Sequence, residues 1–294
     1  MAFNLAYGMA TGAFMSLAGV AGNFASIKPH LDMAAPIMKS VPESAGGKQV
    51  LEHCSGRIEM DNVTFRYAEG APAVLDDLSL KIRPGQSVGV VGKTGCGKST
   101  LMRLLLGFEK PQKGAVLYDG RDIETLDVAS LRRNIGTVLQ DGKLFTGDIF
   151  SNIVVAAPWL TMEDAWEAAE LAGIADDIRA MPMGMNTMVS EGAGGISGGQ
   201  RQRILIARAV APKPKVLFFD EATSALDNVT QRQVSEALDR MKCTRIIVAH
   251  RLSTIRACDR IIVLDGGRVV EDGTYEELCA LGGVFAELVE RQTM

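Results

Sequence analysis

The sequence predicts an α/β fold preceded by an apolar N-terminal helix, and three observations lead to this prediction. A glycine-rich segment, residues 92–99, follows the apolar run 87–91, which predicts a buried strand, and precedes residues 100–107, which predict a helix. A second apolar run, residues 216–219, ends in the two carboxylates Asp220 and Glu221. The first 27 residues carry no charged side chain. The length of 294 residues suits one large domain with an additional N-terminal segment.

The segment from Gly92 to Ser99 fits the phosphate-binding loop pattern G-x-x-x-x-G-K-[ST]. Its glycines let successive backbone N–H groups turn inward around phosphate oxygens, and the N-terminus of the next helix adds positive potential. Lys98 is then placed to reach the β- and γ-phosphates, and Ser99 to ligate Mg²⁺. Because a helix N-terminus and a lysine both favour a thiolate, Cys96 is expected to be the most readily alkylated cysteine. The predicted nucleotide contacts here are Gly92, Thr94, Gly95, Cys96, Gly97, Lys98, Ser99 and Thr100.

Residues 1–27 are long enough to cross a bilayer as a helix, and they are rich in the small residues that let membrane helices approach closely. A secretory signal peptide fits poorly, because no basic segment precedes the apolar run and the run is too long. A soluble amphipathic helix is the alternative, since the run also contains Asn4, Thr11, Ser16, Asn23 and Ser26. Residues 40–56, with several glycines and Pro42, predict a linker.

The remaining residues, 57–294, are expected to combine strands and helices. Strands are predicted at 57–67, 74–82, 87–91, 116–118, 135–139, 215–219 and 244–249. The pattern turns helical between about 142 and 210, with helices at 161–171 and 174–181, and further helices are predicted at 228–242 and 284–291. Thr274, followed three residues later by Glu277, is a capping box that predicts the start of a short helix.

The charge balance argues against one class of function, and the cysteine spacing argues against two kinds of structural site. The 31 basic and 35 acidic side chains give a net charge of −4, which argues against a nucleic-acid binder built on a basic patch. The five cysteines stand far apart and form no Cys-x-x-Cys pair, so the spacing indicates neither a zinc site nor a disulfide framework. A reducing, cytosolic environment is the simplest interpretation for the cysteines.

An ordered set of further motifs follows the phosphate loop. They are Gln140 after an apolar strand, Ile196-Ser197-Gly198-Gly199-Gln200, Asp220-Glu221, Ser224 to Asp227, and His250 after another apolar strand. From Gly56 to the C-terminus the sequence resembles the nucleotide-binding domain of ABC transporters, with Ile196 in place of the usual Leu of the signature motif. The resemblance implies a P-loop NTPase core with an antiparallel β subdomain and an α-helical subdomain, about 142–210, that bears the signature.

The resemblance also implies how ATP and Mg²⁺ are held and how ATP is hydrolysed. Tyr67 is similar to the aromatic residue that stacks on adenine, although an ordinary strand aromatic is the alternative. Mg²⁺ is expected at Ser99, Gln140 and Asp220, with a plain surface amide as the alternative for Gln140. Lys98 clamps the phosphates, Glu221 polarises the attacking water, and His250 contacts the γ-phosphate.

Other residues of the set are implied to face a second ATPase domain in a head-to-tail homodimer. In the family geometry, Ser197, Gly198, Gly199 and Gln200 close over the ATP of the partner. Asp227 faces the same partner, although it also suits a helix cap. Glu191 resembles an acidic residue through which exporters sense their membrane domain, with a solvated loop acid as the alternative.

These features together predict the ATP-hydrolysing part of an ABC exporter. Residues 1–39 are then the end of the membrane region of the same full-length chain, residues 40–56 the linker, and residues 57–294 the ATPase domain on the cytoplasmic face of a cell membrane. The resemblance favours a peptide or bacteriocin as cargo. The alternatives are a soluble ABC ATPase acting in DNA repair or translation and the ATPase subunit of an importer.

Overall fold

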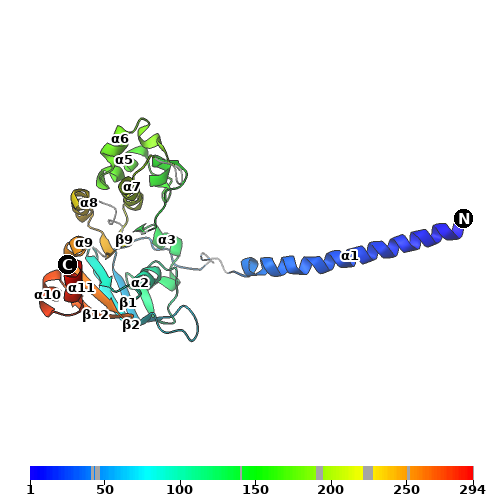
Figure 1. Cartoon of the computed structure of the whole chain (residues 1–294), viewed down its shortest axis with the longest axis horizontal. Coiled ribbons are helices and arrows are strands. Elements are labelled where there is room, and N and C mark those ends of the chain that lie inside the picture. The colour runs from blue at the N-terminus through cyan, green and yellow to red at the C-terminus, as the bar shows by residue number, and fades with distance from the viewer. Residues whose placement is uncertain are drawn as a thin grey trace. The chain divides into compact units, whose positions relative to one another are not determined.

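The computed structural model describes residues 1–40, 43, 47–139, 141–189, 195–220, 228–249 and 252–293. These residues form two compact units, Met1–Gly47 and Lys48–Met294. The prediction that residues 140, 191, 221, 227 and 250 belong to the site therefore concerns residues outside the described part of the chain. Figure 1 labels many of the helices and strands.

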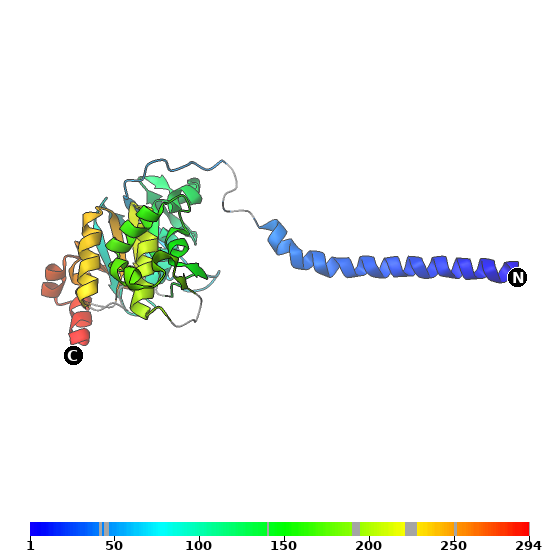
Figure 2. The same cartoon turned by 90° about the horizontal axis from the view of Figure 1, so that it is seen from above.

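The first unit is a single long helix, α1 (Ala2–Lys39), drawn in blue in Figure 2. Its most apolar window has a mean hydropathy of 1.3, and no part of that window is buried. The helix continues through Pro29 and Pro36 to Lys39, well beyond the uncharged run that predicted it. By length and composition it is able to cross a membrane.

The second unit is built on a six-stranded sheet with the order β12-β11-β3-β10-β9-β6. Five neighbouring strands run parallel, and only β12 at one edge is antiparallel to its neighbour. The inner strands are continuous apolar runs because helices cover both faces of such a sheet. The bounds are β3 (Ser87–Gly92), β6 (Ile135–Val138), β9 (Val216–Asp220), β10 (Thr244–Val248), β11 (Arg260–Asp265) and β12 (Arg268–Gly273).

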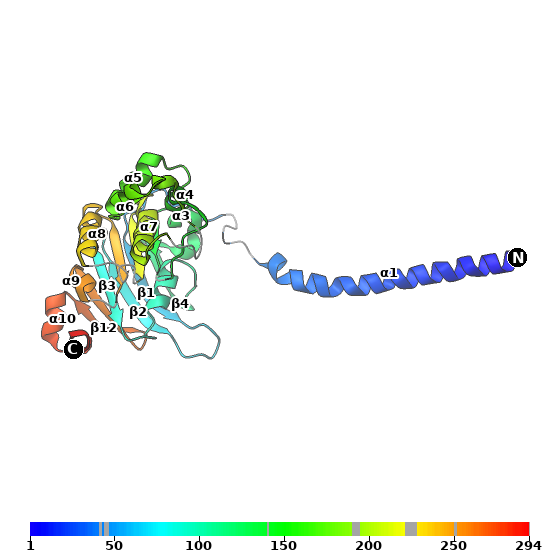
Figure 3. The same cartoon turned by 45° about the horizontal axis from the view of Figure 1, so that its top comes forward.

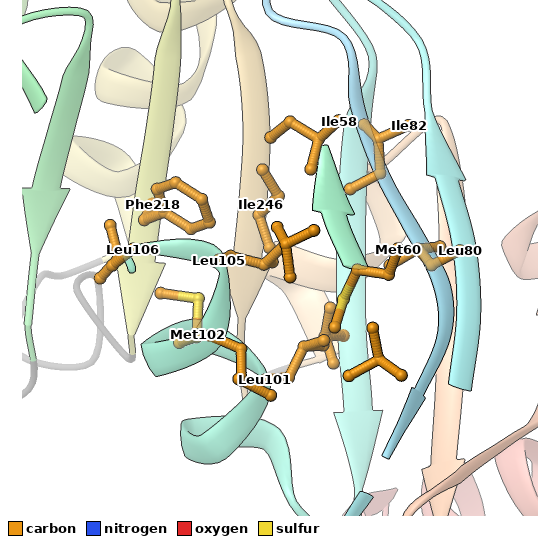
Figure 4. Packing of buried hydrophobic residues seen from close by; sticks show 14 of the residues in the cluster. Ile58, Met60, Leu80, Ile82, Leu101, Met102, Leu105, Leu106, Phe218 and Ile246 are labelled. Carbon is orange, nitrogen blue, oxygen red and sulfur yellow. The ribbon is translucent and has the colours of Figure 1, made fainter. Parts of the chain in front are cut away.

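A second, antiparallel sheet has the order β2-β1-β4-β5, with β1 (Ile58–Phe65), β2 (Leu75–Ile82), β4 (Lys113–Tyr118) and β5 (Arg121–Asp122). Its apolar side chains pack against the helix α2 (Lys98–Leu105) and the face of the large sheet that carries Phe218 and Ile246. Figure 4 shows Met102 and Leu105 of α2 in this core. The helix α2, which follows the phosphate loop, is therefore held in place by its buried apolar side chains.

The helical part lies between β6 and β9 along the chain and packs on the other face of the large sheet (Figure 3). It contains α4 (Ile149–Val154), α5 (Met162–Leu171), α6 (Ala175–Ala180) and α7 (Gly198–Val210). The predicted helical pattern between about 142 and 210 did not include a small sheet formed by β7 (Gly147–Asp148) and β8 (Met188–Val189). Two-residue strands carry too little periodicity to be found from a single sequence. The region also contains η2 (Gly184–Asn186), whereas η1 (Ile123–Thr125) and α3 (Val128–Arg132) precede β6.

The C-terminal part comprises α8 (Asn228–Arg240), α9 (Leu252–Arg256), the β11–β12 hairpin, α10 (Tyr275–Leu281) and α11 (Val284–Thr293). The β11–β12 hairpin was not predicted from the sequence. Gly266 and Gly267 form its turn with φ values of +54° and +79°, and this Gly-Gly pair between two β-branched runs was the signal available. The capping box at Thr274 is confirmed, because its side chain accepts a hydrogen bond from the N–H of Glu277.

Candidate functional site

The predicted phosphate-binding loop joins β3 to α2, the strand–loop–helix context that the motif requires. Gly92 and Gly97 adopt φ values of +151° and +107°. A Cβ atom on Gly92 lies 2.2 Å from the carbonyl oxygen of Leu264, and one on Gly97 lies 2.7 Å from the Cδ2 atom of Leu75. These positions therefore require glycine for both conformation and space. Gly95 has a φ of +82°, but a Cβ atom there meets nothing within 4 Å, so this glycine faces open space.

Lys98 begins α2 with only 7% of its side chain exposed, and its ammonium group lies within the loop. The Nζ atom donates hydrogen bonds to the carbonyl oxygens of Gly92, at 2.8 Å, and Lys93, at 2.9 Å. Both oxygens belong to the main chain, so these contacts orient the ammonium group without neutralising its charge. The charge, together with the free N–H groups of the first helical turn, makes the loop suited to an anion such as phosphate. Ser99, on the next position of the helix, is exposed.

The exposure of Cys96 bears on its predicted reactivity. Its side chain is only 6% exposed, and its Sγ atom lies 3.8 Å from Lys98 Nζ. The thiol points into the loop, where a Cβ atom on Gly92 would be 2.7 Å from the sulfur. This burial counts against ready alkylation of Cys96, because alkylation requires access to the sulfur as well as a favourable charge.

Tyr67 follows β1, with 53% of its side chain exposed. Its ring packs edge to face against Phe65, with the ring centroids 4.9 Å apart. Its hydroxyl lies 3.1 Å from the Oγ1 atom of Thr100, which is buried in the first turn of α2. The antiparallel sheet thus holds an exposed aromatic ring beside the phosphate loop, a contact that links positions 33 residues apart.

The other predicted residues follow strands that end at the same edge of the large sheet. Asp220 is the last residue of β9 and pairs in register with Val248, which also pairs with Val90 of β3. Val138 at the end of β6 pairs with Phe219. Parallel strands place their carboxyl ends together, and ligands of open α/β sheets bind at that edge. The strands that precede residues 140, 221 and 250 therefore end at the same side of the sheet as β3, which leads into the phosphate loop, and β10 is the direct neighbour of β3.

The segment predicted to be a signature motif forms the start of α7. Ser197 is the N-cap, and its Oγ atom accepts a hydrogen bond from the N–H of Gln200 at 3.1 Å. The Oε1 atom of Gln200 in turn accepts from the N–H of Ser197 at 2.9 Å, which completes a capping box. Ser197 and Gly198 are exposed, and a Cβ atom on Gly198 meets nothing within 4 Å. The helix therefore presents an open N-terminus, the kind of structure that receives anions.

Comparison with known proteins agrees with this geometry. A family model described as "ABC transporter" matches residues 75–224. The chain is 44% identical over 292 residues to the cyclolysin secretion/processing ATP-binding protein CyaB of Bordetella pertussis, covering 98% of this chain and 41% of that protein. It is 42% identical over 281 residues to the alpha-hemolysin translocation ATP-binding protein HlyB of Escherichia coli, covering 95% of this chain and 40% of that protein.

Among solved structures, a bacterial Atm1-family ABC exporter with ATP bound matches with a TM-score of 0.84 and 36% sequence identity. The match covers 91% of this chain and 47% of that exporter chain. The chain thus spans about two fifths of the length of the curated relatives it matches. The family model includes both the phosphate loop and the start of α7. The chain belongs to the ABC transporter family, and the loop from Gly92 to Ser99 lies in its ATP-binding, ATPase domain.

Proposed function

We propose that this chain is the ATP-hydrolysing part of an exporter that moves a protein or peptide across a membrane. The observation that carries the proposal is the meeting of the phosphate loop, with Lys98 inside it, and the carboxylate-bearing end of β9 at one edge of the sheet. The names of the relatives describe secretion or translocation of cyclolysin and alpha-hemolysin. They support a protein toxin more than a bacteriocin as the class of cargo.

ATP is held from its two ends in this proposal. The exposed ring of Tyr67 stacks on adenine, and the backbone N–H groups of residues 92–100 with the ammonium of Lys98 bind the phosphates. The fit is supported by Gly95, whose α-carbon faces open space, and by Gly92 and Gly97, whose conformations any side chain would disturb. Cys96 is buried within the loop, with its Sγ atom near Lys98 Nζ, and its backbone N–H donates a hydrogen bond to the carbonyl oxygen of Lys93.

The residues at the sheet edge suit a hard divalent cation, because hydroxyl, carboxylate and amide oxygens are the ligands that Mg²⁺ prefers. Ser99, Asp220 and Gln140 are the proposed protein ligands. A cation held there would supply positive charge to offset the negative charge that develops on the phosphate oxygens during hydrolysis. Asp220 is half-buried and is the last residue of β9, so its backbone position is set by the strand rather than by a loop.

Hydrolysis requires a water molecule aligned with the γ-phosphate. Glu221, directly after Asp220, accepts a proton from that water as the water oxygen bonds to the γ-phosphorus and the bond to the β-phosphate oxygen breaks. His250, two residues beyond the end of β10, steadies the γ-phosphate. Both residues follow strands that end at the edge already occupied by the phosphate loop.

A second copy of the domain completes each site. Ser197, Gly198, Gly199 and Gln200 at the open N-terminus of α7, together with Asp227, bind the ATP held by the partner's phosphate loop. A head-to-tail homodimer with two-fold symmetry then has two equivalent composite sites. The proposed boundaries are those expected from the sequence: residues 1–39 end the membrane region, residues 40–56 link, and residues 57–294 form the ATPase on the cytoplasmic face. Gln140 and Glu191 report the nucleotide state to the membrane region.

The composite site is tested by mixing two inactive variants. Lys98→Ala loses the phosphate clamp, and Gly198→Asp places a carboxylate where the partner's γ-phosphate binds. Each homodimer has two defective sites, whereas a mixed dimer has one site made of intact parts. We expect ATPase activity to return on mixing, up to about a quarter of the unmodified chain if dimers pair at random. Activity that stays at the level of the separate variants, under conditions where the unmodified chain dimerises, contradicts the proposal.

A further inference from the structure

Asp177 of α6 accepts hydrogen bonds from two side chains at the start of α7. The Oδ1 atom of Asp177 accepts a hydrogen bond from Nε2 of Gln200 at 2.8 Å. The other carboxylate oxygen, Oδ2, accepts from the guanidinium of Arg203 at 2.8 Å. Asp177 therefore contacts two side chains on successive turns of the helix that carries the proposed partner-facing segment.

The contact with Gln200 extends to Ser197. The amide of Gln200 has its nitrogen on Asp177 and its oxygen on the N–H of Ser197, at 2.9 Å. An amide group anchored at both ends cannot rotate without breaking a hydrogen bond. Asp177 thus fixes the orientation of the Gln200 side chain, and through it the N-cap of α7.

Arg203 contacts both Asp177 and the turn before α6. Its NH1 atom donates to Asp177 and also to the carbonyl oxygen of Gly173, at 2.6 Å, in the turn before α6. The side chains of Arg203 and Asp177 are 16% and 31% exposed. Burial by itself raises the pKa of Asp177, but the hydrogen bonds from Gln200 and Arg203 outweigh it, so the pKa lies below its usual range. The carboxylate is therefore ionised at neutral pH, and both hydrogen bonds are charge-assisted.

The neighbouring acid provides a comparison within the same helix. Asp176 has a side chain that is 98% exposed and pairs with Arg179 at 3.0 Å. Within the described part of the chain, Asp176 makes no hydrogen bond or ion pair with α7, whereas Asp177 makes two such contacts. Two adjacent carboxylates thus have the same charge and local sequence but different contacts.

We propose that Asp177 is a positioning residue for the signature segment 197–200. It does not touch the nucleotide; it holds Gln200 and Arg203 so that the first turn of α7 is preorganised to receive the partner's ATP. The inference rests on the proposed composite site and adds to it a residue outside the motif. Preorganisation matters here because a donor that must first be ordered loses part of its binding free energy.

If Asp177 acted only through its charge, replacing it would have the opposite effect on ATP binding from a loss of positioning. Asp177 brings a negative charge toward a helix N-terminus that would bind phosphate, so removing the charge should strengthen binding if charge alone mattered. If Asp177 acts by positioning, the signature segment in Asp177→Ala should bind the partner's ATP more weakly, and ATP turnover should be slower. Asp177→Asn retains one acceptor oxygen and should fall between Asp177→Ala and the unmodified chain.

The test begins with ATP turnover and ATP affinity of the whole chain in Asp177→Ala and Asp177→Asn, with Asp176→Ala as the matched control. We expect turnover to fall about tenfold in Asp177→Ala, because the hydrogen bonds from Gln200 and Arg203 to a partly screened charge are lost. ATP binding to the phosphate loop and turnover of the control should remain within about twofold. Turnover of Asp177→Ala equal to that of Asp176→Ala, or faster than the unmodified chain, overturns the proposal.

Mixing separates positioning of the signature from a general loss of structure. In a mixed dimer of Asp177→Ala with Lys98→Ala, one site combines the intact phosphate loop of the first chain with the intact signature of the second. If Asp177 acts through the signature, the mixture hydrolyses ATP about two to three times faster than Asp177→Ala alone at equal total concentration. If the defect lies in the chain's own phosphate loop or fold, activity falls to about half, and the proposal is wrong.

The mixture of Lys98→Ala with Gly198→Asp serves as the reference. If that pair regains activity and the Asp177→Ala pair does not, the role of Asp177 is refuted while the composite site stands. If neither pair regains activity, the composite site itself is refuted and the role of Asp177 with it.

Discussion

The hydroxyl of Tyr67 lies 3.1 Å from the Oγ1 atom of Thr100, so the exposed ring beside the phosphate loop is tied to the helix that follows the loop. The ring also packs against Phe65. Two contacts thus restrict its rotation before any base stacks on it. A ring that is already ordered loses less conformational entropy when it binds a base.

Tyr67→Ala is therefore expected to weaken ATP binding, by about tenfold if stacking contributes as aromatic–base contacts usually do. Tyr67→Phe keeps the ring and loses only the hydrogen bond to Thr100, so its affinity should stay within about threefold of the unmodified chain. Equilibrium binding of a fluorescent ATP analogue, competed with ATP, measures both. Equal affinities for Tyr67→Ala and Tyr67→Phe contradict adenine stacking on this ring.

Glu221→Gln should abolish turnover and preserve ATP binding. The amide cannot accept the proton of the attacking water, and loss of general-base action costs about 10²–10⁴ in rate. Binding is expected to persist because Lys98 and the loop glycines are unchanged. Steady-state ATPase activity measured beside nucleotide affinity checks both halves, with Lys98→Ala as the control that should lose affinity. Near-normal hydrolysis by Glu221→Gln removes this residue from the role of base.

The cysteines are expected to react in an order set by access. Cys279 is half-buried, and the other four are buried. Burial raises the pKa of Cys258 to about 11, so this thiol is almost wholly protonated at mildly alkaline pH. Limited alkylation followed by peptide mass mapping should label Cys279 first and Cys258 last. Unfolding in urea should equalise the five, and preferential labelling of Cys96 in the folded chain contradicts its burial.

Glu271 stabilises the last helix from a neighbouring strand. Its carboxylate on β12 accepts hydrogen bonds from the N–H groups of Val284, at 2.5 Å, and Phe285, at 3.0 Å, at the start of α11. Glu271→Ala should lower the free energy of unfolding by about 1 kcal/mol, as loss of a helix cap does. Hydrogen exchange should accelerate in α11.

Glu287 is the matched control for this change. Its exposed side chain lies 3.9 Å from Arg291 within the same helix, so Glu287→Ala should change stability by less than about 0.5 kcal/mol. Thermal unfolding of both variants gives the comparison. If Glu271→Ala and Glu287→Ala are equally stable, Glu271 does not cap α11.

The exposed apolar surface of α1 should control the association of the chain. Phe14 and Phe24 are more than two-thirds exposed, and such a surface in water buries itself against another molecule. The whole chain is expected to associate or to require detergent, whereas a chain starting at Lys48 should sediment as a smaller species. Phe14→Lys combined with Phe24→Lys should reduce association without truncation. A whole chain that sediments as a monomer in plain buffer contradicts membrane insertion of residues 1–39.

Local pattern was sufficient to predict the elements that carry the chemistry. The glycines and Lys98 lie within eight residues, and the apolar runs before and after them are continuous, so strand, loop and helix follow from neighbouring residues alone. The strands ending at Val138, Asp220 and Val248 were predicted for the same reason. The family resemblance then assigned roles to the residues that follow those strands.

The sequence by itself thus determined the phosphate loop, the order of the motifs and the apolar character of α1, because each depends on residues close together in the chain. Tertiary structure decided the burial of Cys96, the contact of Tyr67 with Thr100, and the anchoring of Gln200 by Asp177. These last two pairs are 33 and 23 residues apart. Such contacts depend on how helices and sheets pack, and no local periodicity records which side chain a distant element will meet.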